Sequence, residues 1–172
     1  NKPYDLTVSR AQEDMNIHVV IEAYKAIPNR VIVIVSNWPI SEYGKHLFEK
    51  NKDKYPNIIL LQAIYDLSIL NAIRSNCQVY LHTHSLCGTA PSLVEEMSLN
   101  IQIIYFDVPT NRFTTENKTL FYKDISSLIQ ILKESNNEKL SEIKNQMFEI
   151  SKRRYVWKRI SKIYQNNLSI NN

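Results

Sequence analysis

The sequence predicts an α/β fold in which a parallel β-sheet carries helices on both faces. Short apolar stretches typical of strands alternate along the chain with amphipathic stretches typical of helices, which is the pattern of a parallel sheet. Residues 31–35 are an unbroken run of valine and isoleucine, as expected for a central strand buried on both sides. The segments richest in polar and functional residues follow apolar stretches. Open sheets of this kind bind ligands there, at the carboxyl ends of the strands.

Six strands and six helices are expected. The strands are predicted, in chain order, at residues 4–9, 31–35, 57–61, 78–81, 101–105 and 119–122. The helices are predicted at residues 16–27, 41–52, 66–75, 90–99, 124–134 and 137–168, the last with a break near 151–154.

The helix at 16–27 illustrates the evidence. Its apolar residues Ile17, Val20, Ile21 and Tyr24 follow the spacing of one buried helical face, and Pro28 ends it.

Local signals place the ends of other elements. Asp66 and Asp124 are expected to cap the helices that follow them, and Asn100 to end the helix before it. Gly44 falls inside the predicted helix at 41–52, and residues 107–118 are expected to form a polar loop.

Composition indicates one globular domain. The chain has 172 residues, of which 44% are hydrophobic and 22% charged. No apolar run reaches the roughly 18 residues of a membrane span, and no signal peptide is expected. Cys77 and Cys87 lack Cys-x-x-Cys spacing, which indicates reduced thiols and a cytoplasmic location. The net charge of +4 modestly favours anionic partners but is too small to indicate nucleic-acid binding.

The stretch from His82 to Met97 carries the most chemistry. Gly88, one of only two glycines in the chain, lies at the turn between a predicted strand and a predicted helix. A helix N-terminus behind such a turn presents unpaired N–H groups and a partial positive charge, which suit a phosphate. Glu95 lies one helical turn past Pro91, so it can face the same ligand from the side.

Residues 82–97, with the sequence His-Thr-His-Ser-Leu-Cys-Gly-Thr-Ala-Pro-Ser-Leu-Val-Glu-Glu-Met, resemble the donor-binding loop of the family 4 glycosyltransferases. They are most similar to a rhamnosyltransferase-like branch of that family. The segment from Ile104 to Arg112 resembles the same branch, as does the opening segment from Val8 to His18. The resemblance spans almost the whole chain and three separated motifs.

The resemblance implies the C-terminal half of a two-domain GT-B glycosyltransferase. Residues 1–172 would form a single Rossmann-like domain that binds a nucleotide-sugar donor, with residues 137–168 as a helical tail. The chain would begin in mid-protein, without the N-terminal, acceptor-binding domain. The family transfers a sugar with anomeric retention to a saccharide or lipid-linked acceptor, which implies bacterial surface polysaccharide biosynthesis. It needs neither a metal nor a cofactor, since the nucleotide-diphosphate sugar is itself the donor substrate.

Two side chains are assigned catalytic roles by the resemblance. Glu95 matches the glutamate that holds the ribose hydroxyls of the donor, and one carboxylate can accept from both hydroxyls. The alternative is that Ser92 to Glu95 form only a capping box. Arg10 matches the arginine that neutralises the leaving diphosphate, and a guanidinium can grip two phosphate oxygens. A surface arginine at a strand end is the alternative.

Backbone amides complete the expected phosphate site. Gly88, Thr89 and Ala90 match positions whose amides approach the diphosphate or the donor sugar, the alternative being a tight turn that starts a helix. Two departures from the family pattern count against catalysis. Cys87 replaces a motif glutamate, and Met15 lies where many relatives carry a phosphate-binding lysine. Because of these departures, the alternative remains that the chain is a non-catalytic nucleotide-sugar-binding or scaffold subunit.

Further candidates flank the loop. His84 is expected to donate to the sugar or phosphate, or else to be a structural histidine. His82 and His84 lack a third metal ligand nearby, so no metal site is expected. Asp107 and Asn111 match the closest branch and could line the donor pocket or order their loop. Ile64 follows the third predicted strand, where relatives recognise the base through main-chain groups.

The C-terminal stretch is basic and aromatic. Its apolar side chains are expected to pack inward at helical spacing while its charges stay solvated. The alternative is a peripheral contact with anionic lipid at the inner membrane face. An unrelated flavodoxin-like or receiver-like module is a further alternative for the whole chain. A receiver domain needs an acidic cluster after the first strand, where this sequence has Val8, Ser9 and Arg10.

Overall fold

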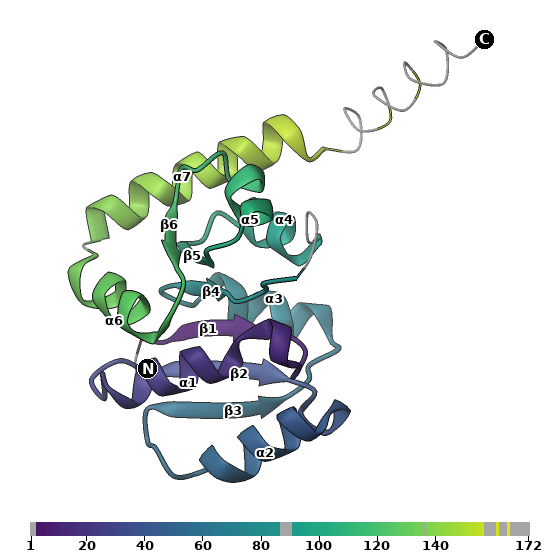
Figure 1. Ribbon diagram of the computed structural model, residues 1–172. Coiled ribbons are helices and arrows are strands. Elements are labelled where there is room, and N and C mark those ends of the chain that lie inside the picture. The colour runs from purple at the N-terminus through teal and green to yellow at the C-terminus, as the bar shows by residue number, and fades with distance from the viewer. Residues whose placement is uncertain (1–2, 87–90, 136, 157–160, 162–164, 166–172) are drawn as a thin grey trace.

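The computed structural model describes residues 3–86, 91–135, 137–156, 161 and 165. Its centre is a six-stranded, fully parallel sheet in the order β3-β2-β1-β4-β5-β6 (Figure 1). The strands are β1 (Asp5–Val8), β2 (Ile32–Ser36), β3 (Ile58–Gln62), β4 (Tyr80–His82), β5 (Ile103–Phe106) and β6 (Leu120–Tyr122). The prediction of a parallel α/β sheet is confirmed, and all six predicted strands are present.

The helices cover both faces of the sheet. They are α1 (Ile17–Lys25), α2 (Glu42–Asn51), α3 (Leu67–Ser75), α4 (Pro91–Ser98), α5 (Pro109–Thr114), α6 (Ile125–Glu134) and α7 (Asn137–Arg154), with 3-10 turns η1 (Glu13–Met15) and η2 (Trp38–Ile40). Figure 1 shows α1 and α6 in front of the sheet and α3 and α4 behind it. None of these helices is long and apolar enough to cross a membrane, within the residues that the structure describes.

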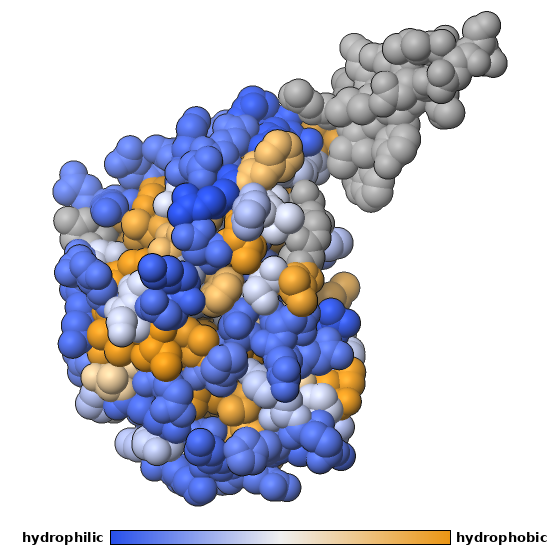
Figure 2. All heavy atoms as spheres, viewed as in Figure 1, coloured by the Kyte–Doolittle hydropathy of each residue, from blue (hydrophilic) through white to orange (hydrophobic). Residues whose placement is uncertain are grey.

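Alternation along the strands builds one core on each face. In β2, Ile32 and Ile34 join the core under α1 and α6, whereas Val33 and Val35 join the core under α4 and α7. All of β2 is buried, as expected for a strand covered on both sides. Hydrophilic side chains lie over the outer faces of α2 and α7 (Figure 2), so each of these helices is amphipathic.

Most of the local end signals work as expected. Asp66 accepts hydrogen bonds from the backbone N–H groups of Ser68 and Ile69, and Asp124 forms a capping box with Ser127. Asn100 adopts a left-handed conformation with φ of 54° just after α4.

Two predictions about helices are wrong in detail. Residues 107–118 are not only a loop, because α5 occupies Pro109–Thr114. The polar composition of this segment is typical of a loop, so it did not predict a helix. In the structure the hydroxyls of Thr114 and Thr115 donate to the carbonyls of Thr110 and Asn111, one helical turn earlier. The predicted break near 151–154 lies too early, because α7 continues to Arg154 before it ends.

Candidate functional site

The three motifs meet at the carboxyl edge of the sheet. Strand β1 is flanked by β2 on one side and β4 on the other, so the chain reverses its direction of winding there, and open sheets form a binding crevice at such a point. The Asn16 amide donates to the Thr83 carbonyl at 3.0 Å, and the Ser85 N–H donates to the Asp14 carbonyl at 2.9 Å. These bonds join the segment after β1 to the segment after β4.

Asn111 attaches the third motif to the second. Its side-chain amide is fully buried and donates to the Phe106 carbonyl at 2.9 Å and to the His84 carbonyl at 3.2 Å. Asn111 therefore orders the loop that carries His84. Asp107 instead forms a paired interaction with Arg112, at 2.5 and 2.7 Å, on the exposed side of α5.

A cavity of about 290 Å³ opens at this edge. Three of the predicted donor-binding residues line it, namely Arg10, Ile64 and His84. Its other lining residues are Val8, Ser9, Val35, Ser36, Asn37, Ala63, Tyr65, Arg74 and Ser92. The cavity combines an apolar floor, formed by the strand ends, with a small number of polar groups, which is typical of small-molecule sites.

The remaining predicted site residues lie elsewhere. Asp107 and Asn111 are not among the residues that line the cavity. Glu95 is 61% exposed and does not line the cavity either. Its Oε2 lies 3.4 Å from Nη1 of Arg74, and Arg74 does line the cavity. Gly88, Thr89 and Ala90 lie outside the described residues, as does Cys87, so their predicted roles stay predictions.

A buried polar cluster lies directly behind the cavity. Glu96 is completely buried on α4, with its carboxyl oxygens 3.7 Å from Nη2 of Arg74 and 3.6 Å from Nδ1 of His82. Burial raises the pKa of Glu96 to about 8, although the positive charge of Arg74 opposes this change. Burial also lowers the pKa of His82 to about 3. At neutral pH, Glu96 is therefore mostly protonated and His82 is neutral.

His84 is also uncharged at neutral pH. Burial, with smaller contributions from His82 and Arg10, lowers its pKa to about 4. Its ring centre lies 4.4 Å from that of His82. A neutral imidazole can donate or accept a hydrogen bond at the cavity wall without adding charge. Within the described part of the chain, no group of three potential metal ligands is present.

The raised pKa of Glu96 predicts a specific pH dependence of stability. The folded protein keeps a proton that an unfolded glutamate, with a pKa of 4.5, has released, so stability falls as the pH rises from 4.5 through 8. Between pH 6.5 and 8 we expect the titration of Glu96 to lower the free energy of unfolding by about 1–2 kcal/mol. The lowered pKa values of His82 and His84 act in the opposite direction, because unfolded histidines, with a pKa of 6.5, release their remaining protons over the same range and so offset part of this loss. Urea unfolding at the two pH values measures the change.

Substitution isolates the group responsible. Glu96→Gln should show no such loss of stability between pH 6.5 and 8. Glu95→Gln, which changes the exposed neighbour, should keep the pH dependence of the wild type. If the stability of Glu96→Gln fell with pH as much as that of the wild type, another group would be responsible for the pH dependence.

Helical spacing is the signal that could have found the buried cluster in the sequence. Leu93, Glu96 and Met97 follow the i, i+3, i+4 spacing of one face of α4, and all three are buried. Arg74 follows Leu70 by four residues on α3, and both are buried. Neither Arg74 nor Glu96 is among the site residues predicted from the sequence.

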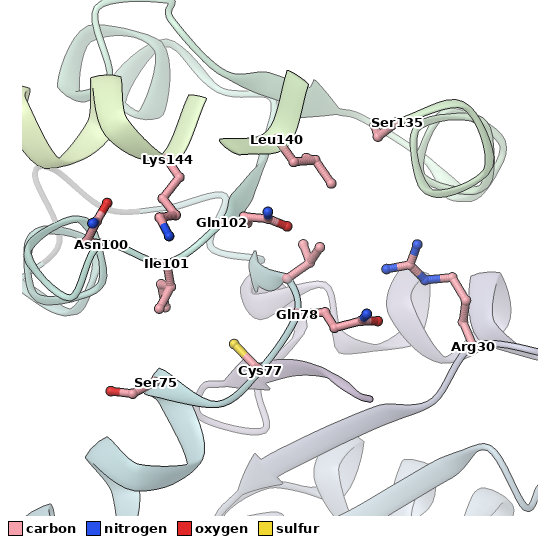
Figure 3. Close-up of a pocket in the computed structure, with 11 residues that line it drawn as sticks. Arg30, Ser75, Cys77, Gln78, Asn100, Ile101, Gln102, Ser135, Leu140 and Lys144 are labelled. Carbon is pink, nitrogen blue, oxygen red and sulfur yellow. The ribbon is translucent and has the colours of Figure 1, made fainter. Parts of the chain in front are cut away.

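A second cavity of about 290 Å³ lies at the opposite, amino edge of the sheet (Figure 3). Figure 3 shows Arg30 and Lys144 on opposite sides of it, with Cys77 below. The guanidinium of Arg30 is already bound to Asp5, at 2.8 and 2.9 Å, and burial raises the pKa of the Cys77 thiol to about 12. None of the three motifs contributes a residue to this cavity, so the carboxyl edge is the stronger candidate site.

Comparisons with known proteins support the fold. No protein-family model matches the chain, and no curated protein matches it in sequence. The pneumococcal O-GlcNAc transferase GtfA, solved with UDP and GlcNAc, is 20% identical, with a TM-score of 0.69 over 98% of this chain and 36% of that one. Anabaena HepE, solved with UDP-glucose, is 16% identical, with a TM-score of 0.81 over 98% of this chain and 49% of that one.

A further similar structure consists of one domain. The C-terminal domain of LpcC, a group 1 family glycosyl transferase from Francisella tularensis, is 13% identical, with a TM-score of 0.69 over 90% of this chain and 87% of that one. By contrast, this chain spans between about a third and a half of the GtfA and HepE chains. It therefore has the Rossmann-like fold of one half of a GT-B glycosyltransferase.

Proposed function

We propose that this chain is the donor-binding half of a retaining glycosyltransferase of family 4, closest to its rhamnosyltransferase-like branch. It would bind a nucleotide-diphosphate sugar and transfer the sugar to a saccharide or lipid-linked acceptor in bacterial surface polysaccharide assembly. The observation that carries the proposal is the cavity at the carboxyl edge, where the three motifs converge around Arg10 and His84. Two similar structures were solved with UDP or UDP-glucose, which agrees with such a ligand.

Arg10 and Glu95 have separate tasks in this proposal. Arg10, at the mouth of the cavity, would neutralise the charge that develops on the departing diphosphate. Glu95 would accept hydrogen bonds from the ribose hydroxyls, and its contact with Arg74 holds its carboxylate near the cavity. The backbone amides of Gly88, Thr89 and Ala90 would bind phosphate oxygens. The chemistry is then positioning and charge stabilisation, with no protein nucleophile, metal or cofactor.

The rest of the enzyme would supply the acceptor site. Residues 1–172 would form one donor-binding domain with a helical tail over 137–168. The acceptor would bind to an N-terminal domain outside this sequence. The protein would act in the cytoplasm, where nucleotide sugars are made, with or without a peripheral contact between its basic tail and the inner membrane face. Nucleic acid is not among its proposed partners, because a net charge of +4 is too small to indicate nucleic-acid binding.

A non-catalytic nucleotide-sugar-binding subunit is the second candidate. Met15 stands where many relatives of the proposed family carry a phosphate-binding lysine, and the structure buries it in the core. Its position therefore supplies no cation to the cavity. Donor hydrolysis or sugar transfer by this chain joined to its acceptor domain would exclude the second candidate, whereas tight donor binding without turnover would favour it.

Calorimetric titration with UDP, GDP and dTDP tests the binding function. We expect one of these nucleotides to bind the wild type. Arg10→Ala and Glu95→Ala should each weaken its binding by roughly tenfold to a hundredfold, since each removes hydrogen bonds that involve a charged group. Lys54→Ala is the control, because Lys54 is exposed in the turn before β3, at the opposite edge of the sheet. Equal affinities of the wild type and both site variants would refute the proposal.

A further inference from the structure

Arg74 is a buried cation that faces the proposed donor cavity. It lies in the last turn of α3, is 6% exposed and lines the cavity together with Arg10 and His84. Its Nε has no hydrogen-bond partner among the residues that the structure describes. Burying a guanidinium group with an unused donor costs free energy unless another group satisfies it. This residue therefore needs an explanation beyond packing.

The two carboxyl groups near Arg74 do not saturate it. Its Nη1 lies 3.4 Å from Glu95, and its Nη2 lies 3.7 Å from Glu96, which is beyond hydrogen-bonding distance. Arg30 provides an internal comparison, because its Nε and Nη2 donate to Asp5 at 2.9 and 2.8 Å. Arg30 is thus a satisfied structural arginine, whereas Arg74 keeps donor capacity for a further acceptor.

The charge of Arg74 is also incompletely neutralised. Burial keeps Glu96 mostly protonated at neutral pH, so it contributes little negative charge. Glu95 is 61% exposed, and water weakens its attraction for the guanidinium. A positive charge consequently remains at the wall of a cavity whose floor is apolar, where an anionic group of a ligand would be attracted strongly.

We propose that Arg74 is a second cationic ligand, in addition to Arg10, for the phosphate groups of the nucleotide diphosphate. This assignment rests on the proposed donor-binding function and extends it to a residue on α3. A guanidinium presents its donors in a fork that fits two phosphate oxygens, so the Arg74 side chain that lines the cavity can bind both oxygens together. Arg74 would supply the cation that the buried Met15 does not.

The test separates phosphate recognition from the rest of the nucleotide. Calorimetry would measure the affinities of the wild type, Arg74→Met and Arg74→Lys for UDP, uridine and inorganic pyrophosphate. If the wild type prefers another base, GDP and guanosine, or dTDP and thymidine, replace UDP and uridine. Arg74→Met should weaken binding of the diphosphate and of pyrophosphate by about tenfold or more, and leave the nucleoside unchanged. Arg74→Lys keeps the charge without the fork and should recover part of the loss.

Each alternative outcome is distinguishable. Glu96→Gln is the control, since it preserves the shape of the buried cluster and should bind all three ligands like the wild type. Wild-type binding by Arg74→Met, together with a loss in Arg10→Ala, would overturn this assignment alone. An equal loss for nucleoside and diphosphate would also overturn it, because Arg74 would then act by positioning Glu95. Absence of binding by the wild type would refute the donor-binding function and this assignment together.

Discussion

Asp5→Ala is expected to destabilise the folded chain by about 3–5 kcal/mol, because it breaks a buried ion pair from one side. Asp5 is 1% exposed at the start of β1, where its carboxylate accepts two hydrogen bonds from Arg30 and a third, at 2.6 Å, from the Tyr24 hydroxyl. Removing the carboxylate leaves the completely buried Tyr24 hydroxyl and the Arg30 guanidinium, on a side chain that is 25% exposed, without their acidic partner. Urea or guanidinium unfolding at pH 7 measures the loss.

The chain contains a matched control for this substitution. Asp107 and Arg112 form the same two-bond arrangement, with contacts of 2.5 and 2.7 Å, but on the surface. Asp107→Ala should therefore cost less than about 1 kcal/mol, since water solvates both groups once they separate. Similar losses for the two aspartate variants would mean that burial does not control the strength of the Asp5 interaction.

Gly44→Ala is expected to destabilise the chain by about 2–3 kcal/mol through overpacking. Alanine normally favours a helix interior over glycine by about 1 kcal/mol, so the expected sign is opposite to the intrinsic preference. A Cβ atom at position 44 would clash with the Trp38 carbonyl oxygen and would lie 2.6 Å from the Cβ of Ala11. The backbone at Trp38 and Ala11 must therefore move, and thermal unfolding should show the loss of stability.

The same substitution should reach the donor cavity. The N-terminus of α2 is attached to the segment after β1, because the Ser41 hydroxyl donates to the Ala11 carbonyl and accepts from the Gly44 N–H. Displacing Ala11 moves its neighbour Arg10, so Gly44→Ala should also weaken nucleotide binding. His46→Ala, on the exposed face of the same helix, should change neither property. Increased stability of Gly44→Ala would show that the close approach relaxes without cost.

Much of the architecture follows from short stretches of sequence. The valine and isoleucine run of β2 predicted a strand buried on both faces, and Asp66 and Asp124 predicted two helix starts. Such signals are local, since they depend on side-chain periodicity and on backbone groups within one turn. The polar helix α5 escaped detection because its threonines and asparagine satisfy backbone groups in a helix as well as in a loop.

The sequence by itself determined the fold class and the edge of the sheet where a ligand is expected. It also marked Arg10, His84 and Ile64, three of the residues that line the cavity. Only the tertiary structure showed that Glu95 is 61% exposed beside Arg74 while its neighbour Glu96 is completely buried, and that Arg74 reaches the same cavity from α3. Adjacent positions on a helix differ by about 100° in direction, so which of two glutamates faces a partner depends on how the helix packs against distant strands.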